Sequence, residues 1–162
     1  MRRRLGALAI GLTSAAVLVG CGTSTAAPPG LSPASLHGPT YRIDAASVGG
    51  LGTVLVDGKG FTLYLFVPDH HASHSRCRGI CAFEWPPLLL PKGVSEPLAG
   101  PGVKTSLLGT TRRADGSRQV TYAGWPLYRW FNDTAPGEAT GENLNNLGGL
   151  WLAISPRGQP VH

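Results

Sequence analysis

The sequence predicts an all-β fold, either a small sandwich or a curled antiparallel sheet, with long loops at 68–84 and 132–149. Glycine and proline are abundant, with 23 and 14 of the 162 residues, which favours many turns over a helical bundle. Short runs of β-branched and aromatic residues lie between glycine turns. No window keeps the apolar period of a long helix, although a short helix around residues 79–84 fits the pattern.

The first predicted element is a hairpin in the N-terminal half of the folded part. Residues 54–56 form a β-type run, an Asp-Gly turn follows at 57–60, and a second run covers 61–66. An Asp-Gly pair between two such runs is a strong hairpin signal, because aspartate and glycine tolerate the positive φ that tight turns require. We therefore expect these two runs to pair.

The second predicted element is a three-stranded meander in the C-terminal half. Residues 110–113 and 119–122 flank an Asp115-Gly116 turn, and Ala123-Gly124 then leads into the run 125–131. Three adjacent strands with tight turns cover more apolar surface than a lone hairpin does. We expect an antiparallel meander here.

Comparison of the chain with itself shows that these elements belong to two repeats. Tyr64 and Tyr128 are 64 residues apart, and so are Asp69 and Asp133. Each half then returns through a strand that begins with tryptophan, at 85–91 and 151–156. The domain is expected to cover 46–162, with repeat one at about 46–100 and repeat two at about 105–157. One repeat alone would leave an apolar face in water, so the two halves are expected to pack about a pseudo-two-fold axis.

Two copies of the motif Tyr-x4-Asp identify a family resemblance. Tyr64 and Asp69 form one copy, and Tyr128 and Asp133 form the other. The surrounding segments LGTVLVDGKGFTLYLF and GGLWLAISP also fit, so that residues 46–157 resemble the bacterial secreted-repeat lipoproteins. The resemblance implies a secreted or membrane-anchored tandem repeat, and it brings no catalytic residues with it.

The N-terminus predicts export and lipidation. Residues 1–20 combine an arginine-rich start with a short apolar stretch, the pattern of a secretory signal peptide. Leu18-Val19-Gly20-Cys21 resembles the lipobox of bacterial lipoproteins, which implies cleavage after Gly20 and a lipid on Cys21. Residues 21–45 would then serve as lipid anchor and flexible tether. The expected location is the cell membrane, lipid-anchored on the extracytoplasmic side.

The charge of the chain gives little support for nucleic-acid binding. The formal net charge is +5, but Arg2, Arg3 and Arg4 lie in the predicted signal peptide. Without residues 1–20, 11 basic residues face 9 acidic ones, and the only short basic run is Arg112-Arg113. We expect no nucleic-acid partner.

Cys77 and Cys81 are expected to form a disulfide. They are an even pair in an exported chain once Cys21 is assigned to lipid. Closing so small a loop stabilises the fold by about 2 kcal/mol in the chain-entropy model. The alternative is a redox-active dithiol, but the Cys-x-x-Cys spacing of thioredoxin-type sites is absent.

The segment before these cysteines is rich in histidine. His70, His71 and His74 lie within five residues, next to Asp69. Such a cluster suggests zinc or copper, with copper favoured if the thiols are reduced. The preferred interpretation is a solvated loop, because clustered histidines without an ordered frame often bind metal only adventitiously. No metal site and no cofactor are therefore predicted.

Two roles remain open for the Tyr-x4-Asp motif. The favoured one is a strand-and-turn clamp made once per repeat, in which the tyrosine ring is buried and the aspartate bonds to turn amides. The alternative is a paired ligand site across the pseudo-two-fold axis. Among the tryptophans, Trp85 and Trp151 are expected in the core, whereas Trp125 and Trp130 are left open as a sugar- or peptide-binding face.

The sequence contains none of the common hydrolase, phosphate-loop or zinc-protease motifs. The expected function is therefore a non-catalytic binding or cell-envelope interaction module, with an envelope protein or a small ligand as possible partner. The alternative is a metal-binding or redox-linked envelope protein that uses the loop of His70, His71 and His74 with Cys77 and Cys81.

Overall fold

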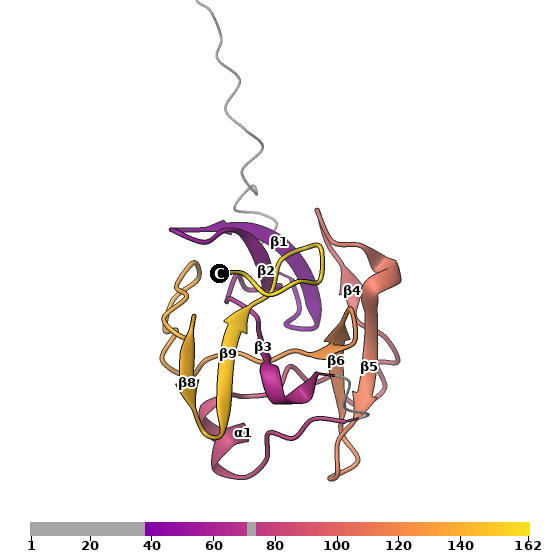
Figure 1. The fold of residues 1–162 in the computed structure, drawn as a ribbon. Helices are drawn as coiled ribbons and strands as arrows, with labels where there is room; N and C mark the ends of the chain where they lie inside the picture. The colour runs from indigo at the N-terminus through magenta and orange to yellow at the C-terminus, as the bar shows by residue number, and fades with distance from the viewer. Residues whose placement is uncertain (1–37, 71–73) are drawn as a thin grey trace, which may run out of the picture.

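The computed structural model describes residues 38–70 and 74–162 (Figure 1). The predicted signal peptide 1–20, the predicted lipidation site Cys21, most of the predicted tether and His71 lie outside the described residues. Within them the fold is mostly β, with three small sheets and one short α-helix, as the sequence predicts. No helix among the described residues is both long and apolar enough to cross a membrane.

The first sheet has the strand order β2-β1-β4. Strand β1 (Arg42–Val48) pairs antiparallel with β2 (Gly52–Asp57), and the short β4 (Leu98–Ala99) lies parallel to β1. Strand β1 begins inside the segment predicted as tether, because Ile43 and Ala45 alternate with polar residues and bury against the core. The folded part therefore extends further toward the N-terminus than position 46.

The Asp-Gly turn after β2 is present where the sequence predicts it. The Gly60 amide donates to the Asp57 carbonyl over 2.8 Å, and the Leu63 amide donates to the Leu55 carbonyl over 2.9 Å. The Asp57 carboxylate accepts further bonds from the amides of Lys59 and Phe61, which fixes the turn. The chain is thereby led back along β2 into β3 (Tyr64–Phe66).

The second sheet has the order β3-β9-β8 and joins the two halves of the chain. Strand β3 of repeat one pairs antiparallel with β9 (Gly149–Ala153) of repeat two, and β9 pairs with β8 (Leu144–Asn146). A short 3-10 helix, η2 (Val67–Asp69), follows β3.

The third sheet, β5-β6-β7, is the predicted meander. Strand β5 (Leu108–Arg112) follows the 3-10 helix η3 (Thr105–Leu107) and pairs with β6 (Arg118–Tyr122), which pairs with β7 (Trp125–Pro126). Helix α1 (Ile80–Glu84) is the short helix predicted around 79–84.

The returning segments are exchanged between the repeats. The first of them, 85–91, forms isolated β-bridges and not the continuous strand that the sequence predicts. The Leu88 amide of repeat one donates to the Leu127 carbonyl of repeat two, and the Val120 amide donates to the Leu88 carbonyl. Conversely, the Leu55 amide of repeat one donates to the Ile154 carbonyl of repeat two. Each repeat therefore supplies a segment that bonds to the backbone of the other. The two repeats are joined by main-chain hydrogen bonds and not only by packing.

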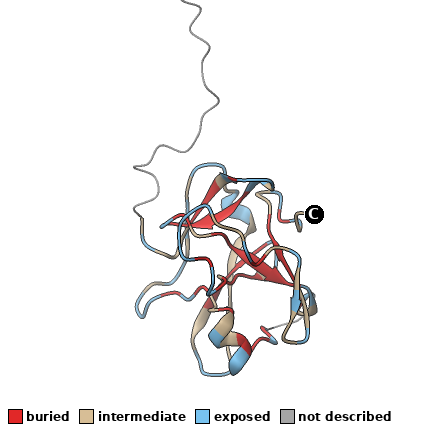
Figure 2. Cartoon of the chain, turned by 90° about the vertical axis from the view of Figure 1, so that its left-hand side faces the viewer, coloured by how far each residue is buried: buried red, intermediate tan, exposed pale blue. Residues whose placement is uncertain are grey.

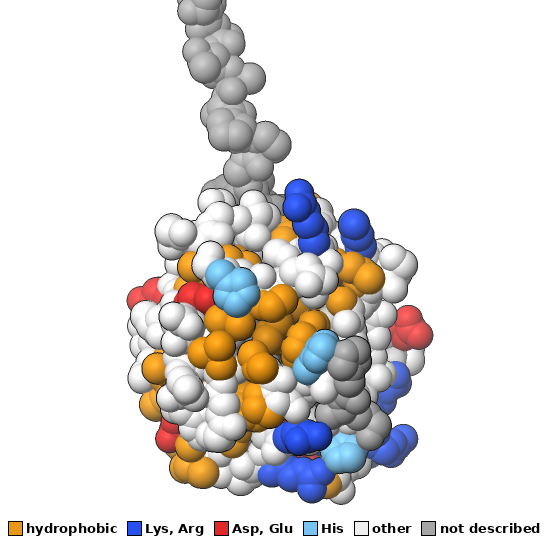
Figure 3. Space-filling view, in the orientation of Figure 1, with side chains coloured by type: hydrophobic (Ala, Val, Ile, Leu, Met, Phe, Trp, Pro, Cys, Tyr) orange, Lys and Arg blue, Asp and Glu red, His pale blue; other side chains and the backbone are white. Residues whose placement is uncertain are grey.

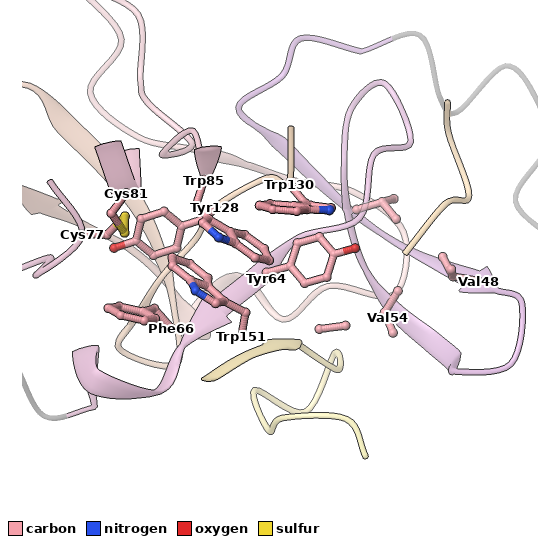
Figure 4. Packing of buried hydrophobic residues seen from close by; sticks show 12 residues of the cluster. Val48, Val54, Tyr64, Phe66, Cys77, Cys81, Trp85, Tyr128, Trp130 and Trp151 are labelled. Carbon is pink, nitrogen blue, oxygen red and sulfur yellow. A yellow bond between two sulfur atoms is a disulfide. The ribbon is translucent and has the colours of Figure 1, made fainter. Parts of the chain in front are cut away.

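The buried residues, which are red in Figure 2, include two hydrophobic clusters. One is mainly aliphatic and lies among β2, β6 and the exchanged strands, with Leu55, Leu63 and Val120 fully buried. The other is aromatic and contains the tyrosines of both motifs, three tryptophans and both cysteines (Figure 4). The aromatic cluster is where the candidate site residues meet.

Candidate functional site

The two Tyr-x4-Asp motifs bond to each other across the molecule. The Tyr64 hydroxyl donates to Asp133 Oδ2 over 2.6 Å, and the Tyr128 hydroxyl donates to Asp69 Oδ2 over 2.5 Å. The tyrosine backbones are also paired, since the Tyr64 amide donates to the Tyr128 carbonyl and the Tyr128 amide to the Tyr64 carbonyl. The pseudo-two-fold axis therefore passes between the tyrosines, and each tyrosine serves the aspartate of the other repeat.

The second oxygen of each aspartate holds its own loop. Asp69 Oδ1 accepts the Arg76 amide over 2.7 Å, and Asp133 Oδ1 accepts the Thr140 amide over 2.8 Å. Both amides lie seven residues after the carboxylate, so the two loops are fastened in the same way. We call the pair Asp69 and Tyr128 clamp one, and the pair Asp133 and Tyr64 clamp two.

The clamps have the structural role that the sequence favours, but each is built across the two repeats and not within one. The aspartates bond to loop amides, as a structural clamp requires, but the tyrosines come from the opposite repeat. All four side chains are buried, with Asp133 the most exposed at 6%. Each tyrosine hydroxyl thus donates to an aspartate of the other repeat, and each aspartate also bonds to its own loop.

Burial sets the protonation of the clamps. It is the main cause that raises the pKa of both Tyr64 and Tyr128, and the bonded aspartate adds to the rise in each case. Burial also raises the pKa of the Asp69 carboxyl, while the bond from Tyr128 opposes that rise. Both tyrosines are therefore neutral hydrogen-bond donors at neutral pH, and neither is a base.

A stack of four aromatic rings crosses the axis beside the clamps (Figure 4). Trp85 and Trp151 lie face to face, with ring centroids 3.9 Å apart and planes 2° apart. Trp130 covers the outer side of Trp85, and Phe66 covers the outer side of Trp151, each at 4.2 Å. Trp85 and Trp151 are core residues, as predicted, and Trp130 joins them.

Trp125 lies apart from this stack. Its ring is partly exposed and stacks on His70 at a centroid distance of 4.7 Å. Of the two tryptophans left open by the sequence, Trp125 therefore keeps contact with the surface, whereas Trp130 is buried.

Cys77 and Cys81 form a disulfide, as the sequence predicts. Both sulfurs lie at the edge of the aromatic cluster (Figure 4). The Cys77 carbonyl accepts a bond from Arg113 Nη2 over 2.7 Å, which links the disulfide loop to repeat two. The cysteines are thus oxidised and are not thiolate ligands.

Of the three clustered histidines, the structure describes His70 and His74, and they lie in different surroundings. His70 stacks on Trp125, and His74 lies at an exposed position on the loop beyond it. Within 38–70 and 74–162, no group of three or more His, Cys, Asp or Glu side chains is placed to hold a metal ion.

The surroundings of clamp one are polar. The Ser75 hydroxyl lies 2.6 Å from the Tyr128 hydroxyl and accepts a bond from Arg113 Nη1 over 2.9 Å. The same nitrogen donates to Gln119 Oε1, and Gln119 Nε2 donates to the Leu127 carbonyl. Clamp one therefore continues through a network of buried polar groups.

The surroundings of clamp two are mostly apolar. Beyond Asp133, the Tyr64 hydroxyl accepts only a long bond of 3.4 Å from the Gly141 amide among the described groups. A Cβ at Gly141 would lie 2.7 Å from Trp85 Cη2, so this loop runs directly against the ring stack. Val48 and Val54 belong to the same cluster of buried residues.

The network of clamp one ends at a surface hollow between the loop 74–79 and the turn that joins β5 to β6. The hollow has a volume of about 230 Å³, and Ser75, Arg78 and Arg113 contribute to its wall. A more open depression of about 340 Å³ adjoins it and is also lined by His74 and Arg112. Figure 3 shows arginine or lysine side chains and a histidine gathered at the lower end of the domain. We call this pair of depressions the arginine hollow.

Sequence reasoning missed the arginine hollow. Arg112-Arg113 is visible as a short basic run, and Arg76 and Arg78 flank Cys77. Nothing in the one-dimensional pattern brings these two segments together, because about 35 residues separate them. The bond between Arg113 and the Cys77 carbonyl is what joins them.

Comparison with known proteins identifies the family of the chain. Residues 46–89 and 109–155 match the model of Lipoprotein_15, described as a secreted repeat of unknown function. A search of curated proteins and a search of solved structures found no match. The two matched segments contain both Tyr-x4-Asp motifs and together cover more than half of the sequence. This chain belongs to the secreted-repeat lipoprotein family, whose description places it outside the cytoplasm.

Proposed function

We propose that this protein is a non-catalytic binding module, held on the extracytoplasmic side of the cell membrane by a lipid on Cys21. The family and the lipobox Leu18-Val19-Gly20-Cys21 support the anchor. The two crossed clamps and the ring stack support the role of a rigid scaffold, because both aspartates are buried and hold loop backbone on each side.

The observation that carries the proposal is the difference between the two clamps. Clamp two ends against buried aromatic and aliphatic side chains. Clamp one continues through Ser75 and Arg113 to the arginine hollow. A surface depression built on one repeat, over a scaffold shared by both, is the arrangement expected of a binding site on a rigid frame.

The groups in contact with Ser75 favour binding over nucleophilic catalysis by this hydroxyl. The Ser75 hydroxyl contacts the Tyr128 hydroxyl, Arg113 and the Cys77 carbonyl. None of these is a general base at neutral pH, since the tyrosine pKa is raised and the guanidinium stays charged. Activation of Ser75 as a nucleophile would need such a base within hydrogen-bond distance.

The anchor is tested by metabolic labelling with an alkyne analogue of palmitate in a bacterial host. We expect label on the full chain, no label on Cys21→Ala, and unchanged label on the control Cys77→Ser/Cys81→Ser. Label that persists in Cys21→Ala would contradict the anchor.

Binding is tested with the mature chain carrying Cys21→Ala, so that lipid does not contribute. The protein is mixed with membrane and cell-wall fractions of the host and sedimented. We expect one fraction to retain it saturably, and the variant Arg78→Ala/Arg112→Ala to be retained less. If neither fraction retains the protein, the proposal of a binding module fails.

A further inference from the structure

We propose that the arginine hollow binds a phosphate-type oxyanion. The inference rests on the proposed function and adds the chemical class of the ligand. It is carried by four features: an excess of unpaired positive charge, a guanidinium held in place from behind, a size that suits one phosphate group, and an apolar rim.

The first feature is the charge. Arg78, Arg112 and Arg113 line the arginine hollow, together with His74. Among the described residues, the ion pairs within 4.0 Å are those of Arg42 with Asp44 and of Arg129 with Asp57, so none of the three arginines is neutralised in this way.

One carboxylate, Asp115, also lines the hollow and works against an anion. It accepts bonds from the amide and the hydroxyl of Ser117, at 2.9 and 2.6 Å, within its own turn. These bonds lower the pKa of Asp115, which therefore stays ionised. The Asp69 carboxyl behind Arg113 also interacts electrostatically with that guanidinium. Three guanidinium groups against these two carboxyl groups still leave a positive site.

The second feature is the preorganisation of Arg113. Its Nη1 donates to Ser75 Oγ and Gln119 Oε1, and its Nη2 donates to the Cys77 carbonyl. Ser75 is 3% exposed and Gln119 is fully buried, so both partners are fixed. A guanidinium has five N–H groups, and these bonds use three of them. Two N–H groups therefore remain for a ligand, at little cost in side-chain entropy.

The third feature is size and shape. The enclosed part of the hollow, at about 230 Å³, has room for one tetrahedral oxyanion with a small substituent. Gly79, Ala82 and Ala114 complete its wall without large side chains that would fill it. Arginine binds phosphate oxygens in paired hydrogen bonds, and several arginines favour a doubly charged anion over a carboxylate.

The fourth feature is the apolar rim. Ile80 and Phe83 of helix α1 are 62% and 71% exposed, and their neighbours Gly79 and Ala82 line the hollow. Helix α1 and the turn that joins β5 to β6, which border the hollow, lie at the end of the domain opposite β1 (Figure 1). The same phosphate chemistry is offered by a free phosphate compound and by an anionic lipid headgroup, and the rim suits the second.

The test uses the mature Cys21→Ala chain and three probes: inorganic phosphate, pyrophosphate and vesicles of phosphatidylglycerol. Titration calorimetry measures the first two, and sedimentation measures the third against vesicles of phosphatidylcholine. We expect binding of at least one probe, weakened at least tenfold by Arg78→Ala/Arg112→Ala. The control Lys104→Ala/Arg157→Ala removes the same charge from exposed positions elsewhere and is expected to change the affinity less than twofold.

The two sources of phosphate give different results. Binding of the soluble probes with no preference for phosphatidylglycerol identifies a free phosphate compound. Binding of phosphatidylglycerol vesicles that also weakens in Ile80→Ser/Phe83→Ser identifies a lipid headgroup. Either result supports the oxyanion site.

Two results would overturn the inference. One is the absence of binding to all three probes. The other is binding that Arg78→Ala/Arg112→Ala and the control Lys104→Ala/Arg157→Ala weaken equally. If the chain still sediments with an envelope fraction in these cases, the binding module stands and only its ligand class is wrong. If it binds neither probes nor fractions, both proposals fail.

Discussion

Clamp one and clamp two have the same geometry and different surroundings. In each, a tyrosine reaches the aspartate of the other repeat, and that aspartate holds an amide seven residues further on. Clamp two receives a bond from the Thr140 hydroxyl and otherwise lies against valines and the ring stack. Clamp one opens through hydroxyl, guanidinium and amide groups toward the surface. The difference teaches that the motif fixes the architecture, while the residues around it determine what the site can bind.

A single pair of equivalent positions accounts for much of this difference. The amides of Leu55 and Val120 bond to the exchanged strands in the same way, so their preceding residues, Val54 and Gln119, are equivalent. Both are fully buried. Valine offers no hydrogen bond, whereas Gln119 holds Arg113 in place. The polar character of clamp one therefore begins inside the core.

The largest expected loss of stability comes from the ring stack, to which both repeats contribute. Trp85→Ala and Trp151→Ala each remove a fully buried ring from the stack, and each should lower the free energy of unfolding by about 3–5 kcal/mol. Urea unfolding followed by circular dichroism measures both values. The two losses should agree within about 1 kcal/mol, because both leave a cavity of similar size in one stack. A loss of stability in only one of the two variants would contradict the equivalence of Trp85 and Trp151.

The next prediction compares the contributions of the two clamps to stability. Tyr128→Phe removes the donor to Asp69 and the contact of Ser75, while Tyr64→Phe removes only the donor to Asp133 and a long bond from Gly141. An unsatisfied buried polar group costs about 1–3 kcal/mol, so both variants lose stability and Tyr128→Phe loses more. Equal losses in urea unfolding would show that the polar surroundings of clamp one add nothing.

The pH dependence of clamp one sharpens the same comparison. Burial raises the folded-state pKa of Asp69 above 3.8, so the folded state holds its proton more tightly than the unfolded state does. Stability from this group is present below pH 3.8 and is lost as the pH rises through the folded pKa. Tyr128→Phe removes a bond that lowers this pKa, so its destabilisation should be greater at pH 7 than at pH 3.5. The difference between the two pH values should disappear in the Asp69→Asn background.

A smaller effect is expected from the disulfide, which belongs to the loop of clamp one. Cys77→Ser/Cys81→Ser should lower the free energy of unfolding by about 2 kcal/mol, the value for so short a loop in the chain-entropy model. Dithiothreitol should have the same effect on the parent protein and none on the variant. A reductant effect on the variant would assign the loss to something other than this bond.

The smallest effect comes from making clamp one resemble clamp two. Gln119→Val leaves the Leu127 carbonyl without its side-chain donor and Arg113 without one acceptor, at a cost of about 1 kcal/mol. Arg113 is then less well held. The free energy of phosphate binding should therefore fall by more than the free energy of unfolding does. Calorimetry and urea unfolding on the same samples compare the two, and unchanged binding would contradict the role of Gln119.

The sequence was a good guide wherever a local signal decides the structure. The Asp57-Gly58 turn, the meander around Asp115-Gly116, the disulfide of Cys77 and Cys81, and the buried Trp85 and Trp151 follow from turn chemistry, spacing and repetition. These features depend on residues close in the chain or on equivalent places in the two repeats.

The exchange of strands could not be predicted from the same signals. A tryptophan strand that suits one hairpin suits the other, because the two repeats resemble each other at the positions that pair. The arginine hollow depends on that exchange, since it brings the loop with Arg78 beside the turn with Arg112. Long-range pairing therefore determined both the crossed clamps and the candidate site.

The exchanged strands have a consequence for how such a chain can arise. Neither half holds all the strands that its own hairpin needs, so a molecule with one copy of the repeat would have to take the missing strand from a second molecule. Two such molecules, each donating to the other, would form a symmetric dimer with the same crossed clamps. Duplication of the coding segment places both copies on one chain, and the linker then replaces a concentration-dependent encounter by an intramolecular one. The present fold thus contains, within a single polypeptide, the strand exchange that such a dimer would have between two chains.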